Sequence, residues 1–437
     1  EALLGAIVSE TEKIRRAPRG KPFVAAPGEK TKRIHLKLKS NINQVDYEEK
    51  RKDRLRLPDG TSALVPSSLR PEVSLRDHQL AGVAWLQNLW GHSPTECRGA
   101  LLADDMGLGK TIQLLTFIAR CLEDHPDLEP VLVVAPVALL ENWREEIDKF
   151  FRPGSMPATL LYGETLAQLR VPQAAIDEQL RQNGLTRLLR RDWRANARIV
   201  LTTYETLRDL EFSLAAERWS IMVCDEAQKI KNPNAMVTRA AKKQNVRFKI
   251  ACTGTPVENT LTDLWCLFDF IQPGFLGSLS EFGQLYRRPI EAETDDDKER
   301  IEELRAKISL QLLRRTKAEV AKDLPAKLER CHKLGISEMQ LRHYGRVMAE
   351  LKKAEGGCKH LEMIQVLRRV ISDPFAFDVA EAERAPVEQI LDHNPKMRWL
   401  IDVLREIRGR QEKVIVFCEF RDLQRMIQRC IGRLLDV

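Results

Sequence analysis

The run Asp104–Thr111 constrains the fold of this 437-residue chain more than any other stretch. It reads DDMGLGKT and lies between an apolar run, 99–103, and a stretch, 112–119, with apolar residues at helical spacing. A strand, a glycine-rich turn and a helix in this order bring backbone amides and a helix N-terminus together, as phosphate-binding loops do. The alternative is an ordinary loop before a core helix, because Asp104 stands where the general pattern has its first glycine.

Two side chains of this loop have specific expected tasks. Lys110 can reach the β- and γ-phosphates of a nucleotide, and Thr111 can ligate Mg²⁺. The sequence therefore predicts an ATP site whose loop residues are Asp105, Met106, Gly107, Leu108, Gly109, Lys110 and Thr111.

A carboxylate pair follows another apolar run, 220–224. At the carboxyl end of a strand that faces a phosphate loop, Asp225 would hold Mg²⁺ through water. Glu226 would orient and deprotonate the attacking water. The alternative is an acidic turn without chemistry. After the next strand, the hydroxyls of a short loop can sense this turn, which makes that loop a coupling element: Thr253, Gly254 and Thr255.

Alternating apolar runs and helical patterns predict an α/β fold, a doubly wound parallel sheet. The expected strands are 130–135, 198–203, 220–224 and 249–252. From 260 to 395 helical patterns dominate, 309–317 among them. A further buried strand is expected over 413–417, followed by a helix over 423–434. The predicted domains are an N-terminal extension (1–74), a nucleotide-binding lobe (75–275), a helical region (276–395) and the start of a second α/β lobe (396–437).

Composition narrows the class of partner. The net charge of +7 and the pI of about 8.9 favour a polyanionic partner. The nine cysteines are scattered without a C-x-x-C pair, so reduced thiols and no zinc site are expected. No apolar run approaches the roughly 18 residues of a membrane span, which predicts a soluble, intracellular protein without a membrane partner.

Two stretches outside the loop carry weaker signals. Residues 30–39 alternate basic and apolar side chains as an edge strand does, and 47–54 are charged. A solvated face is the simpler interpretation of both, and a nucleic-acid contact is the alternative. A helical pattern begins at 75, and its Arg76 and Gln79 are predicted to belong to the ATP site. The amide of Gln79 can donate to and accept from an adenine edge, or it can simply face solvent.

Taken in order, the motifs resemble those of the Swi/Snf-type DNA translocases of helicase superfamily two. The matching stretches are LRDHQLAGVAWL, DDMGLGKT, VLVVAPVALLENW, IVLTTYETL, DEAQKIKNP, TGTPVEN, LLRRTKAEVAKDLPAK and KVIVFCEF. That family has an acidic residue before its G-x-G-K-T, so Asp104 fits the resemblance. Gln228 stands where many members have His, and either side chain can hydrogen-bond to the 253–255 loop.

The resemblance implies a RecA-like P-loop lobe with helical protrusions and the beginning of a second RecA-like lobe. By analogy, Gln79 reads adenine, Lys110 and Thr111 contact phosphate and Mg²⁺, and Asp225 and Glu226 are the metal holder and the catalytic base. It also implies a tracking path on double-stranded DNA phosphates without base readout. The residues expected toward that groove are Pro136, Asn142, Trp143, Thr202, Thr203, Lys229, Lys231 and Asn232. For Trp143 a core position is the alternative.

The resemblance predicts an ATP-driven duplex-DNA translocase. Its hydrolysis would need arginines of a second lobe that this sequence mostly lacks, so we expect the chain alone to bind ATP and to hydrolyse it poorly. A strand-separating helicase and an ATP-gated binding module with little turnover are the alternatives. Many bacterial members act in multi-gene systems, including antiphage defence, so proteins of such a system are possible partners. A cytoplasmic, nucleoid-associated location is expected if the source is bacterial.

Overall fold

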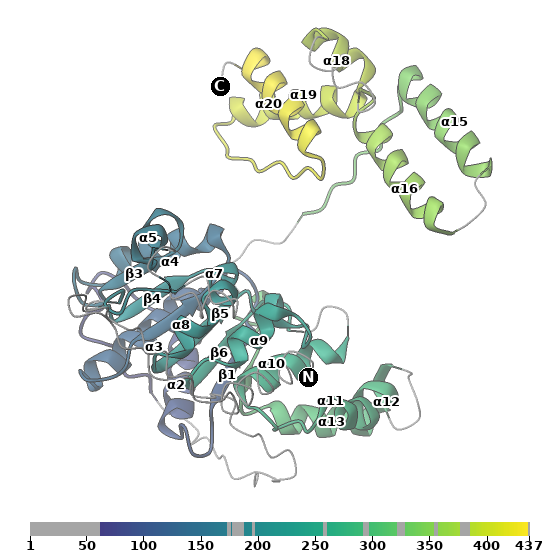
Figure 1. Ribbon diagram of the computed structural model, residues 1–437. Coiled ribbons are helices and arrows are strands. Elements are labelled where there is room, and N and C mark those ends of the chain that lie inside the picture. The colour runs from purple at the N-terminus through teal and green to yellow at the C-terminus, as the bar shows by residue number, and fades with distance from the viewer. Residues whose placement is uncertain are drawn as a thin grey trace, which may run out of the picture. The chain divides into compact units, whose positions relative to one another are not determined.

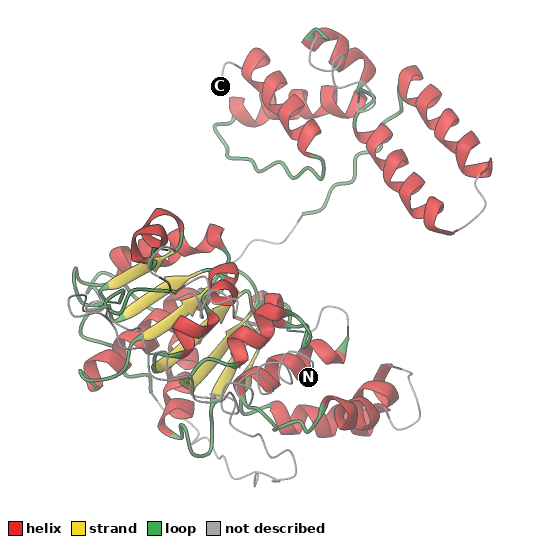
Figure 2. Cartoon of the chain, in the orientation of Figure 1, coloured by secondary structure: helices red, strands yellow, loops and turns green. Residues whose placement is uncertain are grey.

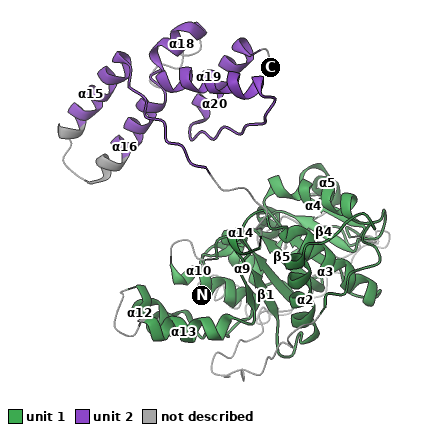
Figure 3. Cartoon of the chain, turned by 180° about the vertical axis from the view of Figure 1, so that it is seen from behind, with its two compact units in different colours: residues 1–324 green, residues 325–437 purple. Residues whose placement is uncertain are grey.

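The computed structural model describes two compact units, residues 1–324 and 325–437 (Figures 1 and 3). The described residues are 62–172, 176, 188–194, 197–256, 260–291, 297–320, 328–353, 357–375 and 385–435. The edge strand expected over 30–39 and the charged stretch 47–54 lie outside them. Residues 62–74 belong to unit 1, where Leu69 joins the hydrophobic core and pairs with Phe151 in an antiparallel bridge.

Unit 1 is built on a seven-stranded parallel sheet in the order β3-β4-β2-β5-β6-β1-β7. The strands are β1 (Gly99–Leu102), β2 (Val131–Val134), β3 (Ala158–Leu161), β4 (Ile199–Thr202), β5 (Trp219–Asp225), β6 (Val246–Cys252) and β7 (Leu312–Leu313). The four strands expected between 130 and 252 are confirmed as β2, β4, β5 and β6, because continuous apolar runs bury both faces of a strand. The short strands β3 and β7 were not expected.

Helices cover both faces of this sheet (Figure 2). Val131 and Val133 of β2 belong to one buried cluster, and Leu132 and Val134 belong to the other. Their alternation within one strand confirms the doubly wound fold. The helices of unit 1 are α2 (Asp77–Gly91), α3 (Lys110–Asp124), α4 (Val137–Phe150), α5 (Gly163–Leu169), α7 (Tyr204–Asp209), α8 (Glu211–Ala215), η2 (Ala227–Ile230), α9 (Met236–Lys242), α10 (Leu261–Ile271), α11 (Leu279–Phe282), η3 (Gly283–Arg287), α12 (Arg288–Glu291), α13 (Asp297–Ile308) and α14 (Lys317–Val320).

The helical region expected over 276–395 is divided between the two units. Its first part, α11 to α13, is an excursion between β6 and β7, after which the chain returns to the sheet. The helix expected over 309–317 is therefore wrong: Leu312 and Leu313 pair with Leu101 and Leu102 of β1 as an edge strand. Backbone groups of β1 that would otherwise be buried without partners favour this extended conformation.

In its described residues, unit 2 contains helices and irregular segments but no strand. The helices are α15 (Glu338–Lys353), α16 (Gly357–Ser372), α18 (Val387–His393), α19 (Pro395–Gly409) and α20 (Arg421–Leu434). The last confirms the helix expected over 423–434, and its Met426 and Cys430 pack with Ile390 and Ile401 in a small core. Among the described residues of both units, no helix combines the length and apolarity needed to cross a bilayer.

The buried strand expected over 413–417 is wrong. The segment has no regular secondary structure, and its side chains are exposed, Phe417 by 92% and Ile415 by 77%. A β-strand requires hydrogen-bonding neighbours, and none is provided by the described residues of unit 2.

Candidate functional site

The glycine-rich turn lies at the carboxyl end of β1 and runs into α3. Gly107 and Gly109 have φ of 85° and 77°, in the left-handed region that glycine adopts without strain. At Gly109 a Cβ atom would also lie 2.4 Å from Nε2 of Gln79. Glycine is thus required here both by the backbone conformation and by the close approach of α2.

Lys110 folds back over the turn. Its Nζ donates to the carbonyl oxygens of Asp104 (2.8 Å) and Asp105 (3.3 Å). Thr111, the second residue of α3, is partly buried beside it, whereas Met106 and Gly107 are exposed at the tip. The exposed glycine-rich tip and the adjacent ammonium group are the kind of groups that can accept a phosphate.

Gln79 holds the turn from α2. Its Nε2 donates to the carbonyl of Leu108 at 3.4 Å, and its Oε1 accepts from the backbone N–H of Arg76 at 3.0 Å. His78 contacts the same carbonyl through Nε2 at 3.1 Å. Gln79 therefore lies against the loop, as an adenine-reading residue must, but its amide also supports the loop. The adenine role stays a prediction.

The acidic turn lies at the end of β5. The buried Asp225 accepts three neutral donors: the indole N–H of Trp143 at Oδ2 (2.9 Å), the backbone N–H of Glu226 at Oδ1 (3.0 Å) and the thiol of Cys252. Burial, followed by the nearby Glu226 carboxylate, raises the pKa of Asp225, although the bond from Trp143 partly opposes this. Glu226 itself has φ of 52°, unusual for a residue with a side chain.

A hydrogen-bonded chain links this turn to the loop after β6. Gln228 donates to Oε2 of Glu226 at 2.7 Å and accepts the hydroxyl proton of Thr253 at 2.9 Å. The Thr253 hydroxyl also accepts from Thr255 N–H at 3.1 Å, and Thr253 N–H bonds to the end of β1. The expected bond from Gln228 to this loop is thus confirmed. A Cβ on Gly254 would lie 3.0 Å from Met106, so the loop also reaches the phosphate turn.

Three residues expected toward a DNA groove face the interior instead. Trp143 is buried against Asp225, and the Thr202 hydroxyl donates to the carbonyl of Leu161 at 3.0 Å. Thr203 caps α7, accepting from Thr206 N–H at 3.0 Å. Their placement at the groove surface is therefore wrong, because their polar atoms are used within the fold.

The other expected DNA contacts remain accessible. Asn142, Lys229 and Asn232 are exposed, and Pro136 and Lys231 are partly exposed. Lys231 lies 3.9 Å from Asp263 in an ion pair. No contact with DNA follows from exposure alone, so the DNA role of these five residues stays a prediction.

Arg315 was not expected at the site, although it lies within the LLRRTK motif. Its guanidinium contacts the carboxylate of Asp104, with Nε 3.0 Å from Oδ1, and Asp104 is fully buried. A buried carboxylate at the end of β1 needs a cation. Because Asp104 replaces the usual glycine, the sequence could have predicted a cationic partner for this carboxylate. It does not identify which Lys or Arg that partner is.

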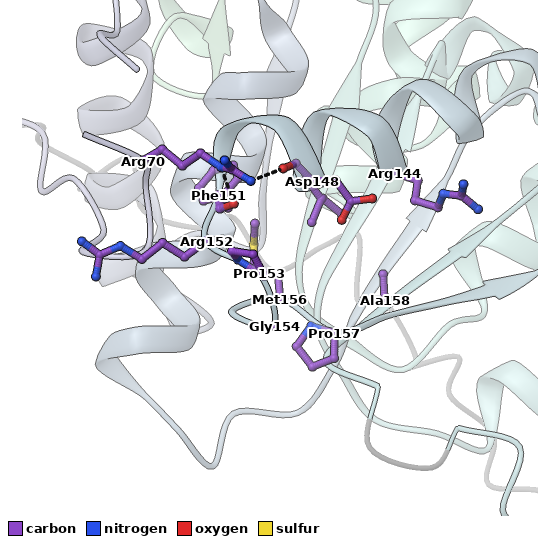
Figure 4. Close-up of a pocket in the computed structure, with 11 residues that line it drawn as sticks. Arg70, Arg144, Asp148, Phe151, Arg152, Pro153, Gly154, Met156, Pro157 and Ala158 are labelled. Carbon is purple, nitrogen blue, oxygen red and sulfur yellow. Dashed lines mark hydrogen bonds between the residues drawn. The ribbon is translucent and has the colours of Figure 1, made fainter. Parts of the chain in front are cut away.

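A separate cavity of about 480 Å³ lies between the end of α4 and the start of β3 (Figure 4). Because all strands are parallel, this is the opposite edge of the sheet from the phosphate loop. The side chains of Arg144 and Arg152 point apart, and Arg70 is bonded to the carbonyls of Asp148 and Phe151. These charges do not converge on a ligand position.

The described residues contain no cluster of three His, Cys, Asp or Glu side chains that could hold a metal by itself. A Mg²⁺ ion bound together with a nucleotide needs fewer protein ligands. The Thr111 hydroxyl and the Asp225 carboxylate are oxygen donors of the kind that this ion prefers.

Comparisons with known proteins agree with this arrangement. The SNF2-related domain model matches residues 78–376. Zorya protein ZorD of Escherichia coli O139:H28 (strain E24377A / ETEC) is 48% identical over 414 residues, 92% of this chain and 38% of that protein. The putative ATP-dependent helicase/translocase YwqA of Bacillus subtilis (strain 168) is 32% identical over 372 residues, 82% of this chain and 37% of YwqA.

A solved structure, the Sulfolobus solfataricus SWI2/SNF2 ATPase core in complex with dsDNA, covers 86% of this chain and 73% of its own, with a TM-score of 0.50 and 28% identity. The chain spans less than two-fifths of the two curated relatives named above. The phosphate turn, the acidic turn and these matches lead to one conclusion: the chain belongs to the SNF2-related family and contains its RecA-like ATPase fold.

Proposed function

We propose that unit 1 binds Mg-ATP and forms part of an ATP-driven motor that moves along double-stranded DNA. One observation carries this proposal: the loop after β6 bridges the phosphate turn after β1 and the acidic turn after β5. A nucleotide-binding element and a carboxylate pair at one sheet edge are the parts that phosphoryl transfer to water requires.

The residues in the loops after β1, β5 and β6 each have a role in this proposal. Lys110 exchanges the carbonyls of Asp104 and Asp105 for phosphate oxygens when nucleotide enters. Thr111 and Asp225 hold Mg²⁺, which neutralises phosphate charge when bound. Glu226, kept in place by Gln228, accepts a proton from the attacking water. Since Gln228 also bonds to Thr253, a change at the phosphates reaches the 253–255 loop.

The DNA part of the proposal rests on weaker support. The chain carries a net charge of +7, and the solved relative from Sulfolobus solfataricus is described in complex with dsDNA. We place phosphate contacts at the accessible residues near the site: Pro136, Asn142, Lys229, Lys231 and Asn232. Binding through phosphates would be independent of DNA sequence and would weaken steeply with salt.

The cellular setting is part of the same proposal. Because one relative is a Zorya protein, we propose that this chain acts with other proteins of a multi-gene defence system in the cytoplasm, near the nucleoid. Sustained hydrolysis is expected only from a longer protein with a second lobe, because an arginine across the cleft can contribute several orders of magnitude in rate.

Nucleotide binding is the direct test. Fluorescent mant-ATP with Mg²⁺ should bind the wild-type chain, and Lys110→Ala should weaken this binding by tenfold or more, since it removes the phosphate-facing ammonium. Lys149→Ala, an exposed lysine near the end of α4, is the matched control and should bind as wild type does. Equal affinity of the two variants would disprove the assignment of the loop.

The proposed base has a separate test. Glu226→Gln should leave mant-ATP affinity within about twofold of wild type, while it abolishes DNA-stimulated turnover in the longer protein. Unchanged turnover would show that Glu226 is not the base.

A further inference from the structure

The backbone of β1 and of the phosphate turn forms hydrogen bonds with the segment 311–315, which lies more than two hundred residues later in the chain. Backbone bonds join Leu101 N–H to Gln311 O (2.7 Å), Ala103 N–H to Leu313 O (2.7 Å) and Asp105 N–H to Arg315 O (3.0 Å). The ladder thus continues beyond the short strand β7 and into the nucleotide loop. The first two residues of the loop are therefore held in place by the segment 311–315 as well as by β1.

The Arg315 side chain then ties three elements together. Besides Asp104, its guanidinium donates to Oε1 of Gln113 in α3 at 2.9 Å and to the carbonyl of His78 in α2. The backbone N–H of Arg315 also bonds to Oδ1 of Asp104 at 3.1 Å. Three donors of one residue therefore reach a fully buried carboxylate. A planar guanidinium can make such a set of bonds, and an ammonium cannot.

Gln113 closes the network. It is fully buried, and its Nε2 donates to Oδ2 of Asp104 and to the carbonyl of Gly109, both at 3.3 Å. Gly109 is the left-handed residue at the N-cap of α3. The two ends of the phosphate turn, Asp104 and Gly109, are consequently held by one connected set of side chains centred on Arg315.

The Lys110 ammonium also contacts Asp104, since it donates to the backbone carbonyls of Asp104 and Asp105. When Lys110 turns toward a phosphate, the loop loses these two bonds. The contacts of Arg315 then remain to keep the backbone amides in position. A site whose shape survives this exchange binds with less reorganisation.

We infer that Arg315 is a positioning residue for nucleotide binding: it acts through Asp104 and Gln113 to keep the phosphate turn in its binding-competent shape. This inference rests on the proposed ATP site. If removing the guanidinium lowers the population of the competent loop to a tenth, the apparent affinity for ATP falls tenfold.

The test compares two neighbouring arginines. Arg315→Gln and Arg314→Gln remove the same charge one residue apart, but Arg314 is exposed. We expect Arg315→Gln to raise the Kd of the chain for mant-ATP about tenfold. Arg314→Gln should leave it within about twofold. The Kd values are measured well below the melting temperature of each variant, with circular dichroism as the check of folding. A merely structural role would lower the melting temperature and leave the Kd of the folded variant unchanged.

The outcomes separate this inference from the proposed function. If the wild-type chain does not bind mant-ATP, the proposed site fails. If wild type binds and Arg315→Gln binds equally well, the positioning role is overturned. If Arg315→Gln does not fold, Gln113→Met removes one guanidinium partner and keeps the ion pair. A Kd raised by several fold in this variant supports the role, and an unchanged Kd overturns it.

Discussion

Two buried aspartates at the same sheet edge differ in what surrounds them. Asp104, at the end of β1, contacts the guanidinium of Arg315. Asp225, at the end of β5, accepts hydrogen bonds from neutral groups, namely the N–H groups of Trp143 and Glu226 and the thiol of Cys252. Among the described residues, the fold therefore supplies a counter-charge to the first carboxylate and forms no ion pair with the second.

This difference assigns different tasks to chemically identical groups. A buried carboxylate that a guanidinium neutralises has little to offer a cation, so Asp104 stabilises the loop. A buried carboxylate with neutral donors keeps an excess of negative charge, and burial raises its pKa. Such a group gains most from a divalent cation, which is why we place Mg²⁺ at Asp225 and not at Asp104 or Asp105.

The largest expected effect tests the counter-charge of Asp104. Asp104→Asn leaves the largely buried guanidinium of Arg315 without an anion, and we expect a loss of about 3 kcal/mol in the free energy of unfolding. Urea denaturation measures it. Asp124→Asn, in the more exposed Arg120–Asp124 pair, is the control and should cost less than about 1 kcal/mol. Equal losses would remove the distinction between the buried pair and a surface pair.

The second effect tests the neutral donor at Asp225. Trp143→Phe removes the indole N–H from a buried carboxylate and should cost about 2 kcal/mol in unfolding free energy, since bonds to charged groups are the stronger class. Trp85→Phe is the matched control, because its indole donates at the same 2.9 Å to the neutral carbonyl of Leu310. It should cost about 1 kcal/mol. A larger loss in the control would contradict a charged acceptor at Asp225.

A third effect tests how closely the Arg315 network is packed. A Cβ on Gly82 would lie 1.9 Å from Oε1 of Gln113 and 3.0 Å from Nη2 of Arg315. Gly82→Ala should therefore destabilise the protein by roughly 1 to 2 kcal/mol despite the better helix propensity of alanine. Gly91→Ala, in the same helix and with no atom within 4 Å, should be neutral or stabilising by about 0.5 kcal/mol. Thermal unfolding of both variants distinguishes crowding from propensity.

The smallest effect is the pH dependence from Asp225. Its pKa is raised in the folded state, so between the unfolded and folded pKa values the native protein binds more protons. The free energy of unfolding therefore falls as pH rises through this window, which begins near 4, and the penalty is complete above the folded pKa. Asp225→Asn lacks this titration. Denaturation series of both proteins should diverge as pH rises, and a constant difference would contradict the raised pKa.

Local patterns were sufficient for much of the site. The phosphate turn, the acidic turn and the Thr253 loop each follow a continuous apolar run, and the parallel fold brings such strand ends to one edge. The partner of Asp104 was not predictable in the same way. Arg315 is 211 residues away, and its segment has a helical pattern that pairing with β1 overrides.

Two other departures have a related cause. The indole of Trp143 combines an apolar body and one donor, so the sequence left core and groove open, and only the position of Asp225 decides between them. The apolar run 413–417 has the composition of a strand, but strand formation depends on neighbouring strands and not on composition alone. The structure adopted at Trp143 and at 413–417 thus depends on other parts of the chain that pack against them, which local sequence does not reveal.

The 211-residue separation between Asp104 and Arg315 also determines how long the nascent chain has Asp104 without its partner. At about 5 to 20 residues per second, a ribosome needs roughly 10 to 40 s to reach Arg315 after it has made Asp104. During that interval the nascent phosphate turn has neither its edge ladder nor its guanidinium. The phosphate turn of the proposed ATP site therefore reaches its final shape only once the segment after α13 has left the ribosome.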